Sequence, residues 1–134
     1  MRRLAFVFVF LFSSTGFVFA VDHAPCDLSV AGIKDKKELI KFLGKLQTAA
    51  AAKDVGALSK LANYPLRVGK KGRIKNESVL KRKFSKVFTP KVLNAIAKLN
   101  RDDLFCSYQG VMVGDGEVWI QEIEGVIVIS SVNN

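Results

Sequence analysis

Few side chains in this sequence could take part in catalysis or bind a metal. Cys26 and Cys106 are the only cysteines, and His23 is the only histidine among 134 residues. Two thiols and one imidazole are fewer ligands than a structural zinc site uses. The sequence contains no Gly-x-Ser-x-Gly nucleophile motif and no phosphate-binding loop. We therefore predict no catalytic residue, no metal ligand and no cofactor. A non-enzymatic protein is favoured over an enzyme.

Residues 1–20 have the three-part organisation of a secretory signal peptide. Arg2 and Arg3 precede an apolar stretch, and Val18-Phe19-Ala20 ends the segment with the residue types that a signal peptidase accepts. We expect cleavage after Ala20, export to the periplasm or the medium, and no stable membrane span in the mature chain. Retention as an uncleaved anchor is the alternative, because the apolar stretch approaches the length that spans a bilayer.

Export changes what the two cysteines are expected to do. In an oxidising compartment, an even number of cysteines usually forms bridges, so we predict a disulfide between Cys26 and Cys106. Such a bridge would tie an N-terminal tail, residues 21–33, to the folded body, residues 34–134. A metal site and a reactive thiol are the competing interpretations.

Five polar or aromatic side chains are candidates for lining a ligand pocket. Strand alternation places Arg67 on the face opposite to that of its two neighbours, so it points either into a cavity or into water. Trp119 and Gln121 share one face of a predicted strand, and a mixture of aromatic and polar groups is typical of a pocket. An edge strand or a partner surface would have the same pattern. The candidates are Tyr64, Arg67, Tyr108, Trp119 and Gln121.

Positive charge is concentrated in the middle of the chain. The formal net charge is +9, and residues 60–101 contain 13 of the 21 lysines and arginines but only one acid, Glu77. If a predicted hairpin and the helix after it share a face, six of these side chains would form a basic patch. The six are Lys70, Lys71, Arg73, Lys75, Arg82 and Lys86.

A basic patch of this kind attracts anionic partners through its electrostatic field. Nucleic acid is disfavoured, because an exported chain rarely meets it and no aromatic residues alternate with these lysines to stack on bases. An anionic component of the cell envelope or a protein partner fits export better. Simple solvation of helix faces is the alternative. A homodimer formed through an exposed sheet face is a further alternative.

Helices are predicted in the first part of the mature chain. Leu39, Phe42, Leu43 and Leu46 recur at helical spacing, and Asp35 can cap a helix that continues to about residue 53. A shorter helix follows from Asp54 to about residue 63. Asn76 is expected to cap a helix that reaches residue 88, and Thr89-Pro90 to begin another that ends at residue 100.

Strands are predicted between and after these helices. Residues 64–68 and 73–75 would form an early hairpin, with Pro65 at a strand start or on an edge strand. Residues 104–109, 111–113, 117–123 and 126–131 would form an antiparallel meander, with tight turns at Asp115-Gly116 and Glu124-Gly125. This order of elements predicts an α+β fold.

Two segments carry a resemblance to a known family. Tyr64-Pro65-Leu66-Arg67-Val68 follows two helices, and residues 110–120 (GVMVGDGEVWI) lie in the meander. Together with the order of elements, they resemble small exported bacterial proteins of the nuclear transport factor 2-like superfamily, over residues 34–132. The resemblance implies that N-terminal helices pack in a strongly curved, cone-like antiparallel sheet.

The resemblance does not select a function, because this superfamily includes isomerases, dehydratases, transport factors and binding domains. Its enzymatic members place an acid, a histidine or a tyrosine inside the cone, whereas the only histidine here lies in the tail. We therefore expect an exported, non-enzymatic binding domain that uses a basic face. The alternative is a small-ligand carrier or enzyme with a polar pocket inside the cone.

Overall fold

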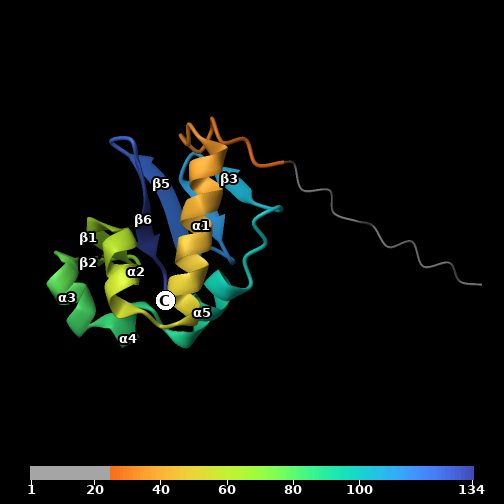
Figure 1. Ribbon diagram of the computed structural model, residues 1–134. Helices are drawn as coiled ribbons and strands as arrows, with labels where there is room; N and C mark the ends of the chain where they lie inside the picture. The colour runs from red at the N-terminus through yellow and green to blue at the C-terminus, as the bar shows by residue number, and fades with distance from the viewer. Residues whose placement is uncertain (1–24) are drawn as a thin grey trace, which may run out of the picture.

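The computed structural model describes residues 25–134 and confirms an α+β fold, in which helices precede a C-terminal series of strands. The predicted signal peptide lies outside the described residues. Figure 1 shows helix α1 crossing in front of the sheet. The elements are α1 (Lys36–Ala51), α2 (Val55–Leu61), β1 (Ala62–Val68), β2 (Gly72–Ile74), α3 (Glu77–Arg82), α4 (Phe84–Val87), α5 (Pro90–Ala97), β3 (Phe105–Ser107), β4 (Gly110–Val113), β5 (Val118–Ile123) and β6 (Val126–Val132).

The predicted helix caps are confirmed. The carboxylate of Asp35 accepts hydrogen bonds from the backbone nitrogens of Lys37 and Glu38 at 2.8 and 3.4 Å, which satisfies free donors at the start of α1. Three further helices begin with side-chain caps from Asp54, Asn76 and Thr89.

The ends of the helices differ from the prediction. The helix expected from residue 76 to residue 88 is divided into α3 and α4, because Lys83 leaves the helical conformation between them (φ −105°, ψ 15°). Helix α1 ends at Ala51 and α5 ends at Ala97, both earlier than the spacing of apolar residues indicated.

The six strands form one sheet in the order β2-β1-β6-β5-β4-β3. The early hairpin and the C-terminal meander are antiparallel, as predicted. The prediction of a wholly antiparallel sheet is wrong, because β1 and β6 pair in parallel and make the sheet mixed. Strand alternation carries no information on direction, and the long connection between these strands permits parallel pairing.

Strand β1 also corrects the expectation for Pro65, because β1 lies between β2 and β6 rather than at an edge. Its ladder with β2 begins one residue later, at Leu66, and its register with β6 shifts between Ala62 and Arg67. Proline has no N–H to donate and is tolerated where a ladder is irregular. The register shift therefore accommodates Pro65 in the interior of the sheet.

The turn between β4 and β5 is longer than predicted. Val113 pairs with Val118, so residues 114–117 form the loop, and positive φ values occur at Gly114 and Gly116 rather than at Asp115. The buried carboxylate of Glu117 accepts a hydrogen bond from the backbone nitrogen of Asp115 at 2.6 Å. The next turn has positive φ at both Glu124 and Gly125, as its sequence indicated.

The helices cover one face of the sheet, where the apolar core is buried. Leu66, Val111, Ile120 and Ile129 are fully buried in this core, beside the apolar face of α1. Across residues 25–134, none of the helices has the length and apolar character needed to cross a bilayer.

The predicted disulfide is present between Cys26 and Cys106, which are separated by 80 residues and have their Cα atoms 4.9 Å apart. The bridge joins the N-terminal tail to strand β3. The tail also contributes to the core, because Ala31 and Ile33 are buried. The described part of the tail is therefore held both covalently and by packing.

Candidate binding surface

One row of side chains crosses the sheet on the face opposite to the helices. Arg73 on β2 pairs with Arg67 on β1, Arg67 pairs with Ser131 on β6, and Ser131 pairs with Trp119 on β5. The row continues through β4 and β3 with Met112 and Phe105. Residues that pair directly across a sheet project from the same face, so we call this face the outer face.

Alternation along β1 and a β-bulge in β6 aim these side chains. In β1, Leu66 is buried in the core, whereas Arg67 is exposed on the outer face. In β6, Ile129 pairs with Ile120 but Ser131 pairs with Trp119, so the register shifts by one residue. A bulge redirects the side chain that follows it. Ser131 therefore belongs to the outer face, although strict alternation from Ile129 would place it in the core.

The outer face contains a hollow of about 410 Å³. This volume lies near the lower limit for ligand pockets, which span about 300 to 1,000 Å³. Two arginines and no carboxylate line the hollow. Its lining residues are Asn63, Pro65, Arg67, Arg73, Tyr108, Gln109, Trp119, Gln121, Ile123, Ser130 and Ser131.

The two arginines have no carboxylate partner within the described chain. Ion pairs among residues 25–134 join Lys81 to Glu77 and Lys91 to Glu117, and neither involves Arg67 or Arg73. Like charges directly opposite each other in a sheet are destabilising. An anion between the guanidinium groups would remove this repulsion.

Ser131 is the buried polar residue of the hollow. Ser131 is 2% exposed, and its hydroxyl oxygen has no hydrogen-bond partner among residues 25–134. Leaving a buried hydroxyl without a partner costs about 1 to 3 kcal/mol. Because serine is small, it also leaves space between Arg67 and Trp119.

The remaining pocket candidates on the outer face provide an aromatic ring and uncharged polar groups. Trp119 is half-buried, and Tyr108 is 83% exposed. The side-chain nitrogen of Gln121 donates a hydrogen bond to the backbone oxygen of Gln109 at 2.8 Å. This bond ties β5 to the loop that carries Tyr108.

Tyr64 lies apart from the other four pocket candidates and packs against the core. Its hydroxyl donates a hydrogen bond to the backbone oxygen of Ser59 at 2.6 Å. Burial, and to a smaller extent the negative charge of Glu77, raise the pKa of Tyr64 to about 12, and the hydrogen bond to Ser59 partly opposes this shift. Tyr64 therefore joins β1 to α2 instead of lining the hollow.

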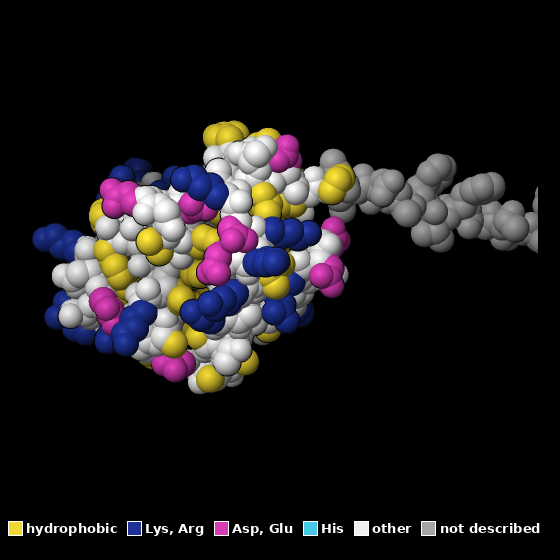
Figure 2. All heavy atoms as spheres, turned by 45° about the horizontal axis from the view of Figure 1, so that its top comes forward, with side chains coloured by type: hydrophobic (Ala, Val, Ile, Leu, Met, Phe, Trp, Pro, Cys, Tyr) yellow, Lys and Arg dark blue, Asp and Glu magenta, His cyan; other side chains and the backbone are white. Residues whose placement is uncertain are grey.

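All six residues of the predicted basic patch are exposed, but the structure distributes them over several elements. Arg73 lines the hollow, and Lys70 and Lys71 lie in the turn between β1 and β2. Lys75 follows β2, whereas Arg82 and Lys86 lie on α3 and α4. In Figure 2, cationic side chains are interspersed with carboxylates and apolar groups over the visible face.

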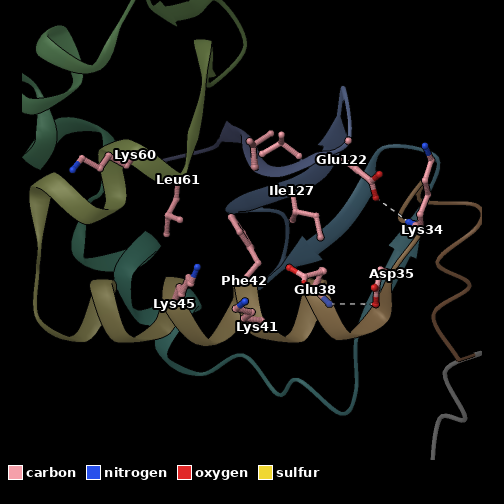
Figure 3. Close-up of a pocket in the computed structure, with 13 residues that line it drawn as sticks. Lys34, Asp35, Glu38, Lys41, Phe42, Lys45, Lys60, Leu61, Glu122 and Ile127 are labelled. Atoms are coloured by element: carbon pink, nitrogen blue, oxygen red, sulfur yellow. Dashed lines mark hydrogen bonds between the residues drawn. The ribbon is translucent and has the colours of Figure 1, made fainter.

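A second hollow of about 380 Å³ lies between α1 and the β5–β6 hairpin (Figure 3). Phe42 and Ile127 extend into it from opposite sides. The cations and acids that line this hollow are mixed, and the carboxylate of Glu122 already accepts a hydrogen bond from the backbone nitrogen of Lys34 at 2.9 Å. This second hollow therefore has acids beside its cations, whereas the hollow on the outer face has two arginines and no acid.

Sequence reasoning identified four lining residues and Arg73, but it missed Ser131, Asn63 and Gln109. A bulge has no reliable sequence signal, and the only hint was two consecutive serines at the end of an apolar strand. Within residues 25–134, no cluster of histidine, cysteine or acidic side chains has the arrangement of a metal site.

Comparison of the chain with models of protein families, with curated proteins and with solved structures finds no match. The candidate surface therefore rests on its own geometry.

Proposed function

We propose that this protein is an exported, non-enzymatic binding domain that holds an anionic partner on the outer face and the adjoining β1–β2 hairpin. One observation carries the proposal. Arg67 and Arg73 lie opposite each other on adjacent strands at a hollow that no acid lines, and both are exposed and without a carboxylate partner among residues 25–134.

Arginine suits this role, because its planar guanidinium group presents several N–H donors to a carboxylate or phosphate and keeps its charge at any physiological pH. The lysines of the hairpin would add long-range attraction, which speeds the encounter with an anion. The three hairpin lysines, Lys70, Lys71 and Lys75, are exposed, and they lie close to Arg67 and Arg73 in the sequence.

The partner class follows from the expected compartment. The predicted signal peptide and the disulfide are compatible with export, where anionic envelope components and acidic proteins are the available partners. Membership of the nuclear transport factor 2-like superfamily, with its cone-like sheet, is part of this proposal. On a cone-like sheet, a partner held on the outer face would lie outside the cone rather than inside it.

A small-ligand carrier or enzyme with a pocket between helices and sheet is less well supported. Apolar side chains occupy the helix-facing side of the sheet, including Leu66, Ile120 and Ile129. Four of the five pocket candidates line the hollow on the outer face, and Tyr64 is engaged with Ser59.

Charge reversal tests the proposal. Lys70, Lys71 and Lys75 would be replaced together by glutamate, and a control variant would carry the same replacement at Lys36, Lys37 and Lys53. All six lysines are exposed, so both variants change the net charge equally. On immobilised dextran sulfate, we expect the hairpin variant to elute at clearly lower salt than the control, because screening weakens surface charge attraction. Equal elution of the two variants would contradict the proposal.

A further inference from the structure

The hollow on the outer face has features that general attraction to anions does not require. Two arginines lie at one end of the residue row, Trp119 lies further along it, and the small Ser131 lies between them. Neighbouring strands are about 4.8 Å apart, so Arg67 and Trp119, two strands apart, have Cα atoms separated by about 10 Å. A ligand that reached both would need a charged group on a compact body.

The arginine end of the hollow selects an oxyanion. Guanidinium groups form paired, charge-assisted hydrogen bonds with the two oxygens of a carboxylate or with those of a phosphate. Because Arg67 and Arg73 are directly opposite, one oxyanion can contact both. No lining residue is acidic, so the bound anion meets no repulsion within the hollow.

The tryptophan end of the hollow selects a ring. The half-buried Trp119 is part of the lining, and an indole face attracts the weakly positive C–H groups of a saturated ring. Side chains with amide or hydroxyl groups line the same hollow, namely those of Asn63, Gln121 and Tyr108. The free donors and acceptors of these groups can form hydrogen bonds with the hydroxyls of a sugar, which an acyl chain cannot do.

Ser131 is the independent sign that a polar occupant belongs here. Its hydroxyl is buried and lacks a hydrogen-bond partner within the described part of the chain, although Ser131 belongs to the lining of the hollow. Buried polar groups in folded proteins nearly always have a partner, and an unsatisfied one calls for an explanation. A polar ligand bound in the hollow would supply the missing partner.

We infer that the hollow binds a six-membered sugar ring that carries a carboxylate or a phosphate, such as one unit of an acidic polysaccharide or a sugar phosphate. The inference rests on the proposed function, because it names the anionic group that the outer face would recognise.

Trp119 supplies the measurement, because it is the only tryptophan in the chain, so intrinsic fluorescence reports directly on the hollow. The disulfide-bonded chain without residues 1–20 would be titrated with D-glucuronate and D-glucose 6-phosphate. D-glucose, inorganic phosphate and adenosine 5′-monophosphate are the comparison ligands. We expect at least one acidic sugar to bind tenfold or more tightly than each of these, and the stronger of the two identifies carboxylate or phosphate as the natural charge. Equal binding of inorganic phosphate, or tighter binding of the nucleotide, would overturn the inference.

Two variants locate the site. Arg67→Gln removes one guanidinium and should weaken binding of the preferred acidic sugar tenfold or more. Lys37→Gln removes one exposed charge on α1, outside both the lining of the hollow and the hairpin, and should change affinity less than twofold. Equal effects of the two variants would show that only net charge matters and would overturn the inference.

Retention on dextran sulfate separates the inference from the proposed function. If retention still depends on the hairpin lysines while no acidic sugar is preferred, the inference fails and the proposed function stands.

Discussion

The two faces of the sheet are built from alternate residues of the same strands, and yet they have opposite physical properties. Leu66 is fully buried against the helices, while its neighbour Arg67 is exposed on the outer face. Likewise Ile120 is fully buried, whereas Gln121 lines the hollow. The helix-facing side therefore supplies the stability of the fold, and the outer face is free to carry groups that folding does not need.

The outer face even contains features that oppose folding. It pairs two like charges across adjacent strands and buries a hydroxyl without a partner. Proteins often depart from local rules of stability at functional sites, and the proposed binding role of the outer face would account for these features. Stability and binding should therefore respond to different substitutions.

The largest effect on stability is expected from the disulfide, which lies at β3. Replacing Cys26 and Cys106 together by serine removes the constraint that the bridge places on an 80-residue separation in the unfolded chain. The chain-entropy relation gives a loss of about 4.5 kcal/mol in the free energy of unfolding. Urea denaturation would measure it. At temperatures where the variant remains folded, binding at the outer face should be unchanged; a parallel loss of binding would break the separation of the two faces.

A neighbouring pair of residues in β1 tests the comparison most directly. Leu66→Ala should lower the free energy of unfolding by about 3 kcal/mol, because it leaves a cavity in the core. Arg67→Ala should change it by less than about 0.5 kcal/mol, because that side chain is exposed and has no ion-pair partner among the described residues. Similar losses from both substitutions, in urea unfolding, would mean that the outer face also supports the fold.

Tyr64 gives the core side a pH dependence. Its folded pKa is raised to about 12 from 10.0, so the unfolded state loses its proton first as the pH rises. Stability from this group is therefore complete below about pH 10 and is lost as the pH rises toward 12. Tyr64→Phe should cost about 1 kcal/mol at neutral pH, through the lost hydrogen bond to Ser59, and should make alkaline unfolding less steep. Unchanged steepness would assign the alkaline transition to other groups.

A small effect of the opposite sign is expected at Ser131. Ser131→Ala removes an unsatisfied buried hydroxyl and should raise the free energy of unfolding by about 1 kcal/mol or less. The same change should weaken binding of the preferred acidic sugar. Thermal unfolding and tryptophan fluorescence would measure the two effects. A destabilised variant would show that the hydroxyl has a partner in the folded protein, and the contrast between the faces would lose one of its supports.

Local rules predicted much of this fold. Asp35, Asn76 and Thr89 cap helices because a short polar side chain before an amphipathic segment can accept a hydrogen bond from a free backbone N–H of the first turn. Alternation in β1 placed Arg67 opposite the core, and the cysteine count indicated the disulfide. These features depend on neighbours in the sequence or on composition.

The features that were not predicted depend on distant pairings. The parallel partner of β1 lies at the other end of the chain, and the bulge that redirects Ser131 exists only relative to β5. Tyr64 was grouped with the pocket candidates because its type fitted, but alternation within β1 places it on the core side with Leu66. The sequence therefore predicted most of the residue types that line the hollow, but not the bulge that places Ser131 in it.

The position of β6 has a consequence for how the protein is made. This last strand joins β1, formed from residues 62–68, to the meander of β5, β4 and β3. Until residues 126–132 are available, the early hairpin and the later strands have no common partner. A chain synthesised only as far as residue 125 therefore has its sheet in two separate halves, and residues 126–132 join them.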